Sequence, residues 1–422
     1  MGWLVPIRAR VLAAILAAVV VAMGSTPVAR AAEPITIGFG MALTGGLAAV
    51  GKSALLGMQI WQEDVNAKGG IMGRPVKLVY YDDQSNPPNV PSIYSKLLDI
   101  DKVNLVVSGY ATNMIAPAMP VVMQHNVLFL SLFGLAVNNQ FHYPRYFSML
   151  PTGPDPERAF SQGFFDVAMA ADPKPKTIAI AAADAQFAQN AADGARKLAK
   201  AAGLKIVYDR NYPPTTTDYT PIVRAIQAAD PEIVYIASYP PDSVGMVRAI
   251  NEVGLKARFV GGGMVGLQVT AIKQQLGAQL NGFLDYDFWI PAPTMQFPGI
   301  LAFLKTYQAK AGEAGVDPVG WYIAPFAYAN LQVLADAIEG TKSLDQDKLA
   351  DYVRTHSFKT IVGDIAYGKD GEWSKSRVLE VQFQGFKTGS IDELKDVQHE
   401  AILEPGEYRT GKVVAPFNEA KK

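Results

Sequence analysis

Cysteine is absent from the 422 residues of this chain. Its absence excludes a disulfide framework, a zinc site with thiolate ligands and catalysis by a nucleophilic thiol. It also leaves no residue to which a lipid anchor could be attached after cleavage of a leader. The four histidines, at positions 125, 142, 356 and 399, do not have the spacing of metal ligands. We therefore expect neither a metal site nor a bound cofactor.

Motifs of hydrolases are also missing. The sequence has no H-E-x-x-H and no serine in a G-x-S-x-G elbow. Asp82 and Asp83 are adjacent, so on a strand their carboxylates point to opposite faces and do not cooperate. Asp184 follows an expected strand but has no obvious catalytic partner. An exported hydrolase stays an alternative for which the sequence supplies no catalytic residues, and we expect a protein that is not an enzyme.

An excess of positive charge is missing as well. Lysine and arginine number 38 against 39 aspartate and glutamate residues, a net charge of −1. Loss of the N-terminal leader described next removes three arginines and no acid, which brings the net charge to −4. Proteins that bind nucleic acid usually present a basic face. We therefore expect no nucleic-acid partner.

Only the N-terminus has a long uninterrupted apolar run. Arg8 and Arg10 precede "VLAAILAAVVVAMG", and small residues follow at Ala29 to Ala31. A basic region, a short apolar core and an A-x-A site indicate a secretory signal peptide, residues 1–31, cleaved after Ala31. A membrane anchor is the alternative, but an apolar run of 14 residues is short for a bilayer. We expect export to the periplasm and no membrane insertion after cleavage.

Two glycine motifs suggest nucleotide binding. "TGGLAAVGKS", Thr44 to Ser53, contains G-x-x-x-x-G-K-[ST], the pattern of a phosphate-binding loop. Its interior, residues 47–50, lacks glycine, although such loops wrap a phosphate with backbone N–H groups. "GGGMVG", residues 261–266, matches the dinucleotide pattern but lies in mid-chain instead of in an opening βα unit. Because nucleotides are scarce outside the plasma membrane, we expect neither motif to bind one.

Strand-like apolar runs alternate with helical patterns along most of the mature chain of about 391 residues, a length typical of two domains. The alternation predicts an α/β fold with parallel sheets covered by helices on both faces. A proline-containing stretch, residues 146–157, is expected to be irregular and to connect two similar halves. Strands are expected at residues 35–43, 76–83, 103–109, 127–131, 177–184, 205–213, 232–239, 258–263, 282–289 and 378–384, followed by a polar tail. Helices are expected at residues 53–68, 89–100, 116–125, 191–202, 220–228, 242–253, 267–276, 323–338 and 348–356.

Loops beyond the carboxyl ends of the strands are the expected ligand-binding region of such sheets. These loops cover residues 44–51, 108–114, 131–138, 184–190, 238–243 and 261–266. The candidate residues in them are mostly small, apolar or aromatic: Ala111, Thr112, Phe133, Gly134, Leu135, Phe187, Tyr239 and Met264. Packing of the strand ends is the alternative for each of them, because apolar residues usually belong to the core.

The segment after the leader resembles a known family. "TGGLAAVGKSALLGMQIWQEDVNAKGGIMGRPVKLVYYDDQSNP" is similar to the opening of the leucine/isoleucine/valine-type periplasmic binding proteins of ABC importers. Further matches are "VGLKARFVGG" and "TIVGDIAYGKDGEW", so the resemblance covers nearly the whole mature chain. It implies two Rossmann-like lobes that close on a small ligand. It also implies that the protein delivers the ligand to a membrane permease, which separate ATPase subunits drive. We expect the protein to be a monomer.

The resemblance also implies three crossovers between the lobes. We place them near Pro151, Asp287 and Trp373. Lobe 1 then contains residues 32–151 and 287–372, and lobe 2 contains residues 152–286 and 373–422.

Ligand contacts of the family transfer only partly to this sequence. The resemblance places a carboxylate site at Thr112 and Phe133, with Leu135 where a second hydroxyl is usual. Val50 stands in place of an aromatic residue at the pocket wall, and Phe187 in place of a tyrosine, whereas Tyr239 is kept. Gly263 occupies the position of the acid that meets an α-ammonium group.

The substitution at Gly263 has the largest consequence. A desolvated ammonium without a carboxylate partner is unfavourable by several kcal/mol. We therefore expect a small apolar or aromatic ligand, a carboxylic acid or its amide. A branched-chain amino acid is the alternative if Asp184, Asp242 or Asp285 replaces the missing acid. A sensory protein that reports to a membrane receptor is a further alternative.

Overall fold

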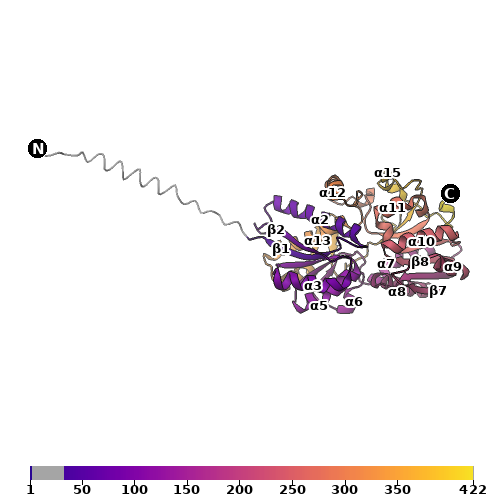
Figure 1. The fold of residues 1–422 in the computed structure, drawn as a ribbon, viewed down its shortest axis with the longest axis horizontal. Helices are drawn as coiled ribbons and strands as arrows, with labels where there is room; N and C mark the ends of the chain where they lie inside the picture. The colour runs from indigo at the N-terminus through magenta and orange to yellow at the C-terminus, as the bar shows by residue number, and fades with distance from the viewer. Residues whose placement is uncertain (2–32, 422) are drawn as a thin grey trace.

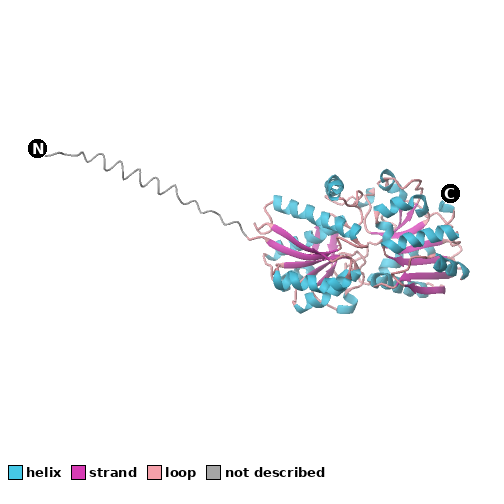
Figure 2. Ribbon diagram, in the orientation of Figure 1, coloured by secondary structure: helices cyan, strands magenta, loops and turns pink. Residues whose placement is uncertain are grey.

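Two lobes lie side by side in the protein, each built on a central sheet with helices on both faces (Figure 1, Figure 2). The computed structural model describes Met1 and residues 33–421. The expected signal peptide, residues 1–31, lies outside the described residues apart from Met1. The arrangement confirms the expected α/β fold with a parallel-sheet core in each lobe.

The first lobe contains a five-stranded sheet in the order β2-β1-β3-β4-β5, in which all neighbouring strands are parallel. The strands are β1 (Ile35–Met41), β2 (Val76–Asp82), β3 (Leu105–Tyr110), β4 (Phe129–Leu132) and β5 (Tyr146–Ser148). Every residue of β3, β4 and β5 is buried. Continuous burial of this kind is typical of parallel strands that are covered on both faces.

The second lobe contains a seven-stranded sheet in the order β14-β13-β10-β9-β8-β6-β7. Its parallel strands are β6 (Thr177–Ala183), β7 (Lys205–Tyr212), β8 (Ile233–Ser238), β9 (Phe259–Met264) and β10 (Phe283–Asp287). Two antiparallel strands complete it: β13 (Leu379–Phe383) and β14 (Glu400–Glu404). The expectation of a polar tail was wrong for β14, because its pairing with β13 buries Ala401 and Ile402.

The five parallel strands have the same spatial order in both lobes. Numbered along the chain within each lobe, the order is 2-1-3-4-5. The strand order reverses between β1 and β3 in the first lobe and between β6 and β8 in the second. Ligands of doubly wound sheets bind beyond the carboxyl ends of the strands at such switch points. The loops after β1, β3, β6 and β8 are therefore the structural candidates for a site.

Helices of the first lobe come from two distant parts of the chain. The early ones are α2 (Ala48–Ala67), α3 (Val90–Ser95), α4 (Thr112–Ile115), α5 (Met119–Gln124) and α6 (Asn138–Phe141). The later ones are α12 (Ile300–Ala314), α13 (Ala324–Thr341) and α14 (Gln346–Thr355), followed by the hairpin β11 (Ser357–Thr360) and β12 (Gly363–Ala366). Figure 1 shows α13 beside α2. Gly57 allows this approach, since a Cβ there would lie 2.5 Å from the carbonyl oxygen of Ala324.

Helices of the second lobe are α7 (Pro156–Met169), α8 (Gln186–Ala201), α9 (Thr220–Ala228), α10 (Pro240–Val253), α11 (Thr270–Leu276) and α15 (Ile391–Leu394). Short 3-10 segments lie at Pro87–Asn89, Ala116–Ala118, Val265–Gln268, Gly277–Leu280, Pro293–Met295, Val397–His399 and Glu419–Lys421, and a π-helical segment at Lys96–Ile100. No helix in the described part of the chain is both long enough and apolar enough to cross a membrane.

The described chain passes between the lobes three times. It does so between β5 and α7, between β10 and α12, and between β12 and β13. The residue boundaries near Pro151, Asp287 and Trp373 stay predictions. The stretch 146–157 is less irregular than expected, because it contains β5 and the first turn of α7. Pro156 occupies the first helical turn of α7, where a missing N–H costs no hydrogen bond.

Candidate functional site

An inner cavity lies between the lobes at the carboxyl ends of the strands. Thr112 follows β3, Phe187 follows β6 and Tyr239 follows β8. The cavity has a volume of about 20 Å³, which is about the space of one water molecule. Its lining consists of Tyr110, Ala111, Thr112, Phe133, Leu135, Leu150, Phe160, Phe187, Tyr239, Val265, Tyr286, Phe288 and Tyr322.

Aromatic rings from both lobes make most of this lining. The ring of Phe133 lies 4.8 Å from that of Phe288, centroid to centroid, in an edge-to-face arrangement. In the second lobe the rings of Phe160 and Tyr286 are 4.6 Å apart. None of the described residues that line the inner cavity carries a charge. The inner cavity is therefore an apolar, aromatic site with a few polar groups, of the kind that binds a small organic molecule.

Three tyrosine hydroxyls supply polar groups at one side of the inner cavity. The hydroxyl of Tyr322 lies 2.9 Å from that of Tyr286 and 3.5 Å from that of Tyr110. Burial raises the pKa of all three well above the ordinary value of tyrosine. They therefore stay protonated at neutral pH and can donate hydrogen bonds to a ligand oxygen.

The backbone is strained where β3 and β4 reach the inner cavity. Ala111 has φ of 85° and ψ of 138°, a region that is otherwise nearly restricted to glycine. Phe133 also has a positive φ, 58°. Strained residues are concentrated at ligand-binding and active sites. Between the two strands, the amide N–H of Leu135 donates to Oγ1 of Thr112 at 3.0 Å, so the Thr112 hydroxyl proton stays available for a ligand.

Hydrogen bonds join the lobes around the inner cavity. The hydroxyl of Tyr239 in the second lobe donates to Oδ1 of Asn113 in the first at 2.7 Å. The side-chain amide of Asn190 donates to the carbonyl oxygen of Leu135 at 2.8 Å. Because a ring-sized molecule needs more than the available volume, ligand entry requires that these contacts open or that the cavity walls move.

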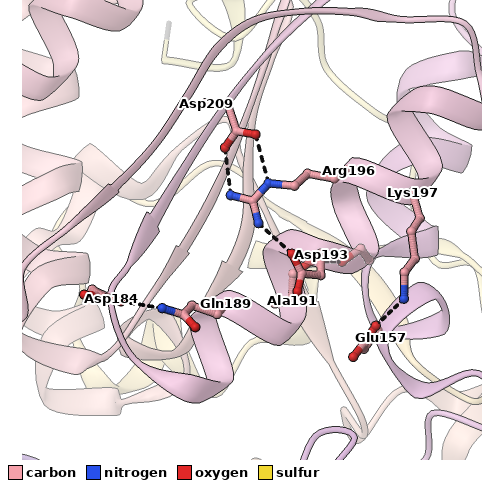
Figure 3. Close-up of polar contacts among 9 residues, drawn as sticks. Glu157, Asp184, Gln189, Ala191, Asp193, Arg196, Lys197 and Asp209 are labelled. Atoms are coloured by element: carbon pink, nitrogen blue, oxygen red, sulfur yellow. Dashed lines mark hydrogen bonds and ion pairs between the residues drawn. The ribbon is translucent and has the colours of Figure 1, made fainter.

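Helix α8 carries both Phe187 and Asn190 to the interface between the lobes. Figure 3 shows how this helix is held on its own lobe. Arg196 makes two hydrogen bonds to the carboxylate of Asp209 in β7, at 2.7 and 2.9 Å, and a third to Asp193 at 2.7 Å. These partly exposed contacts add to the burial of Ala188, Ala191, Ala195 and Leu198, the apolar face by which α8 packs on its lobe.

A larger outer chamber adjoins the inner cavity. Its volume is about 220 Å³, and Tyr322 lines both spaces. Its lining consists of Ala49, Val50, Lys52, Ser53, Gln268, Val269, Thr270, Ala271, Gln274, Gly315, Val316, Asp317, Pro318, Tyr322 and Ile323. An apolar cavity of about 150 Å³ is sufficient for benzene, so a small aromatic molecule can occupy the outer chamber without displacement of its walls.

The ten site residues expected from the sequence fall into three groups. The inner cavity is lined by Ala111, Thr112, Phe133, Leu135, Phe187 and Tyr239. Val50 lines the outer chamber, whereas Gly134, Gly263 and Met264 line neither space. A Cβ on Gly134 would face Ser131 and Tyr146, inside the first lobe.

Gly263 lies directly behind the aromatic lining. A Cβ at this position would lie 3.0 Å from Cε1 of Phe160, whose ring lines the inner cavity. The absence of a side chain here thus provides the space that the Phe160 ring fills. Met264 is buried, and its amide N–H donates to Oδ1 of Asp285 at 3.0 Å.

Sequence reasoning missed seven residues of the inner cavity: Tyr110, Leu150, Phe160, Val265, Tyr286, Phe288 and Tyr322. Tyr110 and Val265 lie within the candidate loops 108–114 and 261–266, whereas Tyr286 lies on β10, which no candidate loop follows. Tyr322 precedes α13, and Phe160 lies on α7, which the sequence did not predict. Aromatic residues at the end of an expected strand, as in "LDYDFW", were the sequence feature that could have identified some of these cavity residues.

The three acids considered as replacements at Gly263 do not line the inner cavity. Asp184 is exposed and accepts a hydrogen bond from Gln189 (Figure 3). Asp242 accepts from the Tyr212 hydroxyl at 2.7 Å and from the Tyr239 amide at 3.1 Å.

Asp285 is the only one of the three that is fully buried. Its carboxylate accepts from the amide N–H of Met264 and from the side chain of Gln268, at 3.0 and 3.2 Å. Burial raises the pKa of Asp285 well above the ordinary range of aspartate, which favours its neutral form. A neutral carboxyl group is a poor partner for an ammonium ion.

Both glycine motifs have structural explanations other than phosphate binding. Helix α2 begins at Ala48, so residues 48–50, the interior of the pattern, are helical and do not form a loop that wraps a phosphate. A Cβ on Gly51 would lie 2.0 Å from the carbonyl oxygen of Ala42, so this glycine permits close contact between helix and chain. In the second motif, residues 261–264 lie within β9 instead of a turn before a helix.

Comparisons with known proteins agree with this architecture. A leucine-, isoleucine-, valine-, threonine- and alanine-binding protein of Pseudomonas aeruginosa is 27% identical over 351 residues, which cover 83% of this chain and 90% of the relative. A branched-chain amino acid transporter substrate-binding protein of Streptococcus pneumoniae, solved in complex with isoleucine, has a TM-score of 0.70 at 20% identity and covers 91% of this chain and 100% of that chain.

A second solved structure has the same fold and a different ligand. It is an ABC-transporter solute binding protein of Rhodopseudomonas palustris BisB5 in complex with 3,4-dihydroxy benzoic acid. The TM-score is 0.69 at 17% identity, and the match covers 84% of this chain and 94% of that chain. Residues 34–381 of this chain match the family model described as periplasmic binding protein, and the chain therefore belongs to this family of solute-binding proteins.

Proposed function

We propose that the protein captures a small aromatic or apolar carboxylic acid, or its amide, between its lobes and delivers it to the permease of an ABC importer. The observation that carries the proposal is the uncharged aromatic lining of the inner cavity at the switch points of both sheets. An aromatic ring gains contact with rings of both lobes there. A ligand that contacts both lobes stabilises the closed arrangement.

The polar end of such a ligand is assigned to the hydroxyl groups of the inner cavity. Thr112 can donate its hydroxyl proton, and Tyr110, Tyr286 and Tyr322 form the hydroxyl cluster. Hydrogen bonds to a charged group contribute about 1.5–3 kcal/mol each. The outer chamber, with Val50 and Lys52 in its wall, serves as the vestibule on the way to the inner cavity.

The chemistry disfavours an α-amino acid at the same place. The resemblance to the family implies Gly263 in place of the acid that meets an ammonium group, and the three candidate replacement acids do not line the inner cavity. Burial of an ammonium group without a carboxylate partner is unfavourable by several kcal/mol. The complex of a fold relative with 3,4-dihydroxy benzoic acid supports a ring-bearing acid as ligand.

A branched-chain amino acid is the second candidate. The observation in its favour is the Pseudomonas aeruginosa relative, whose name includes leucine, isoleucine and valine, together with its coverage of most of both chains. Under this alternative an acid such as Asp285 would have to approach the ligand after a rearrangement of Gln268, to which it is hydrogen-bonded.

The cellular setting follows from the same proposal. The leader is removed after Ala31, and the mature protein acts as a monomer in the periplasm, without membrane insertion. The ATPase subunits of the importer supply the energy, so no cofactor is required by the binding protein. Genes for a permease and its ATPase next to this gene would support transport, whereas a neighbouring membrane receptor gene would support the sensory alternative.

A ligand screen tests the proposal. The mature protein, residues 32–422, is unfolded, dialysed and refolded to remove copurified molecules, and its melting temperature is measured with 4-hydroxybenzoate, 3,4-dihydroxybenzoate, benzamide, leucine and isoleucine. We expect stabilisation by the aromatic compounds, of about 2.7 kcal/mol at 100 times the dissociation constant. Tight binding of leucine with no response to aromatic acids would contradict the proposal. As a matched control, Phe187→Ala should weaken ring-bearing ligands more than Phe303→Ala, because Phe303, a buried residue of α12, lines neither the inner cavity nor the outer chamber.

A further inference from the structure

A third cavity lies where the chain passes between the lobes. This hinge cavity has a volume of about 520 Å³ and shares no lining residue with the inner cavity or the outer chamber. Its lining includes Phe297, Gln332, Lys359, Asp364 and Arg377. Residues of the first lobe, from α13 and the β11–β12 hairpin, thus meet residues of the segments that connect to the second.

Arg377 is the unusual member of this lining. Its side chain belongs to a residue that is only 8% exposed, yet no carboxylate of the described residues lies within 4.0 Å of its guanidinium group. Its Nε and Nη2 atoms are buried and have no hydrogen-bond partner in the described part of the chain. Native proteins rarely leave buried polar groups unpaired, and a buried charge without a counter-charge is strongly unfavourable.

Aromatic rings surround the guanidinium group. Its central carbon lies 4.8 Å from the ring centroid of Phe297 and 5.0 Å from that of Trp373. Stacked rings satisfy the faces of a guanidinium but cannot accept the hydrogen bonds of its in-plane N–H groups. The planar arrangement of these N–H groups matches two oxygen atoms of a carboxylate, phosphate or sulfate.

The other charges of the hinge cavity leave it positive. Lys359 and Asp364 are opposite each other in the β11–β12 pairing and both are exposed, so their charges compensate. Arg377 then remains as the net positive charge. Burial lowers the pKa of Arg377 to about 10, so the group is still protonated at neutral pH. Gln332, whose carboxamide oxygen accepts the Ile361 amide N–H at 2.9 Å, adds an NH2 donor to the lining.

We propose that the hinge cavity binds a small oxyanion, a carboxylate, phosphate or sulfate, through the guanidinium group of Arg377. The site is separate from the proposed ligand site, so the two proposals can fail independently. It adjoins the hinge: the amide N–H of Arg377 donates to the carbonyl oxygen of Pro151 at 2.7 Å, which joins the first and third connecting segments. An anion bound to Arg377 therefore contacts a residue that links the segments about which the lobes move.

Anion titrations of the mature protein test this proposal. The melting temperature is measured with increasing phosphate, sulfate or acetate, with sodium chloride added to keep the ionic strength constant. We expect a saturable rise of about 1–4 °C with at least one of the three oxyanions. Arg377→Met should lose this rise, since it keeps the aliphatic packing and removes the donor.

Arg145→Met is the matched control. Arg145 is paired with Asp347 on the first lobe, away from the hinge cavity, so its substitution should leave the anion response unchanged. An equal response of wild type and Arg377→Met, or no response beyond that of sodium chloride, overturns the proposal. If Arg377→Met does not fold, the anomalous signal of selenium in wild-type crystals grown with selenate decides: a peak beside Arg377 supports the site, and its absence there overturns it.

Discussion

The hydroxyl of Tyr239 donates a hydrogen bond of 2.7 Å to Oδ1 of Asn113, and this bond joins the two lobes. Tyr239 follows β8 at the switch point of the second sheet, and Asn113 lies on α4 just after β3 of the first. Tyr239 also lines the inner cavity. The same side chain therefore contributes to the proposed ligand site and to the contact between the lobes.

Loss of this bond should weaken closure. We expect Asn113→Ala to lower ligand affinity about fivefold, or about 1 kcal/mol, because Tyr239 loses its partner across the lobes. Small-angle scattering of the ligand-free variant should give a larger radius of gyration than that of wild type. Asn139→Ala, at an exposed position of α6, is the control. Unchanged affinity and scattering of Asn113→Ala would show that the bond does not hold the lobes together.

Thr112 tests where the carboxyl group of the ligand binds. Thr112→Val removes the hydroxyl that we assign to this group, and affinity for a carboxylate should fall by about 1.5–3 kcal/mol. The variant also loses the acceptor of the Leu135 amide N–H, so the melting temperature without ligand has to be measured separately. Affinity for the matching amide should fall less. Equal losses for acid and amide would place the carboxyl group elsewhere.

Gly51 tests the structural explanation of the phosphate-loop pattern. We expect Gly51→Ala to lower the free energy of unfolding by about 2–3 kcal/mol, because its Cβ would lie 2.0 Å from the Ala42 carbonyl oxygen. Gly312→Ala is the matched control. It also lies within a helix, but a Cβ there meets no atom within 4 Å, so a gain of about 0.5–1 kcal/mol is expected from helix propensity. Urea denaturation measures both, and equal effects would contradict the contact.

Glu372 gives a pH dependence of stability. Burial raises its pKa to about 8 in the folded protein, whereas an unfolded chain titrates near 4.5. Between these values the folded state keeps a proton that the unfolded state has lost, so the unfolding free energy falls as pH rises from about 4.5 to about 8. Glu372→Gln should remove this contribution. The difference in unfolding free energy, variant minus wild type, should therefore be about 2–4 kcal/mol larger at pH 8.5 than at pH 4. The control is Glu313→Gln, at an exposed acid of α12. If the unfolding free energies of wild type and Glu372→Gln differ by the same amount at every pH, the assignment is contradicted.

Local patterns were sufficient to predict much of the fold. The buried runs of β3 and β8 and the helical pattern of α10 lie where the sequence indicated them, because burial on both faces requires continuous apolar strands. Helix α7 and strand β14 were missed. The prolines before α7 suggested a loop, and β14 becomes a strand only through its pairing with β13.

The candidate site was predictable where it lies on loops after strands. Thr112, Phe187 and Tyr239 follow parallel strands directly, and the order of those strands brings them to one edge. Tyr322 could not be found this way, since it precedes α13 in a segment far along the chain. Its hydroxyl reaches that of Tyr286 only because the chain returns to the first lobe after β10.

The sequence by itself determined the α/β class and the absence of thiol chemistry. These features depend on residue type and on short-range periodicity. Only the tertiary structure decided that Gly51 meets Ala42, that the rings around Phe133 and Phe160 face one cavity, and that Arg377 is buried without a carboxylate. Each of these depends on how separate elements pack in the folded chain, which residue type and short-range periodicity do not show.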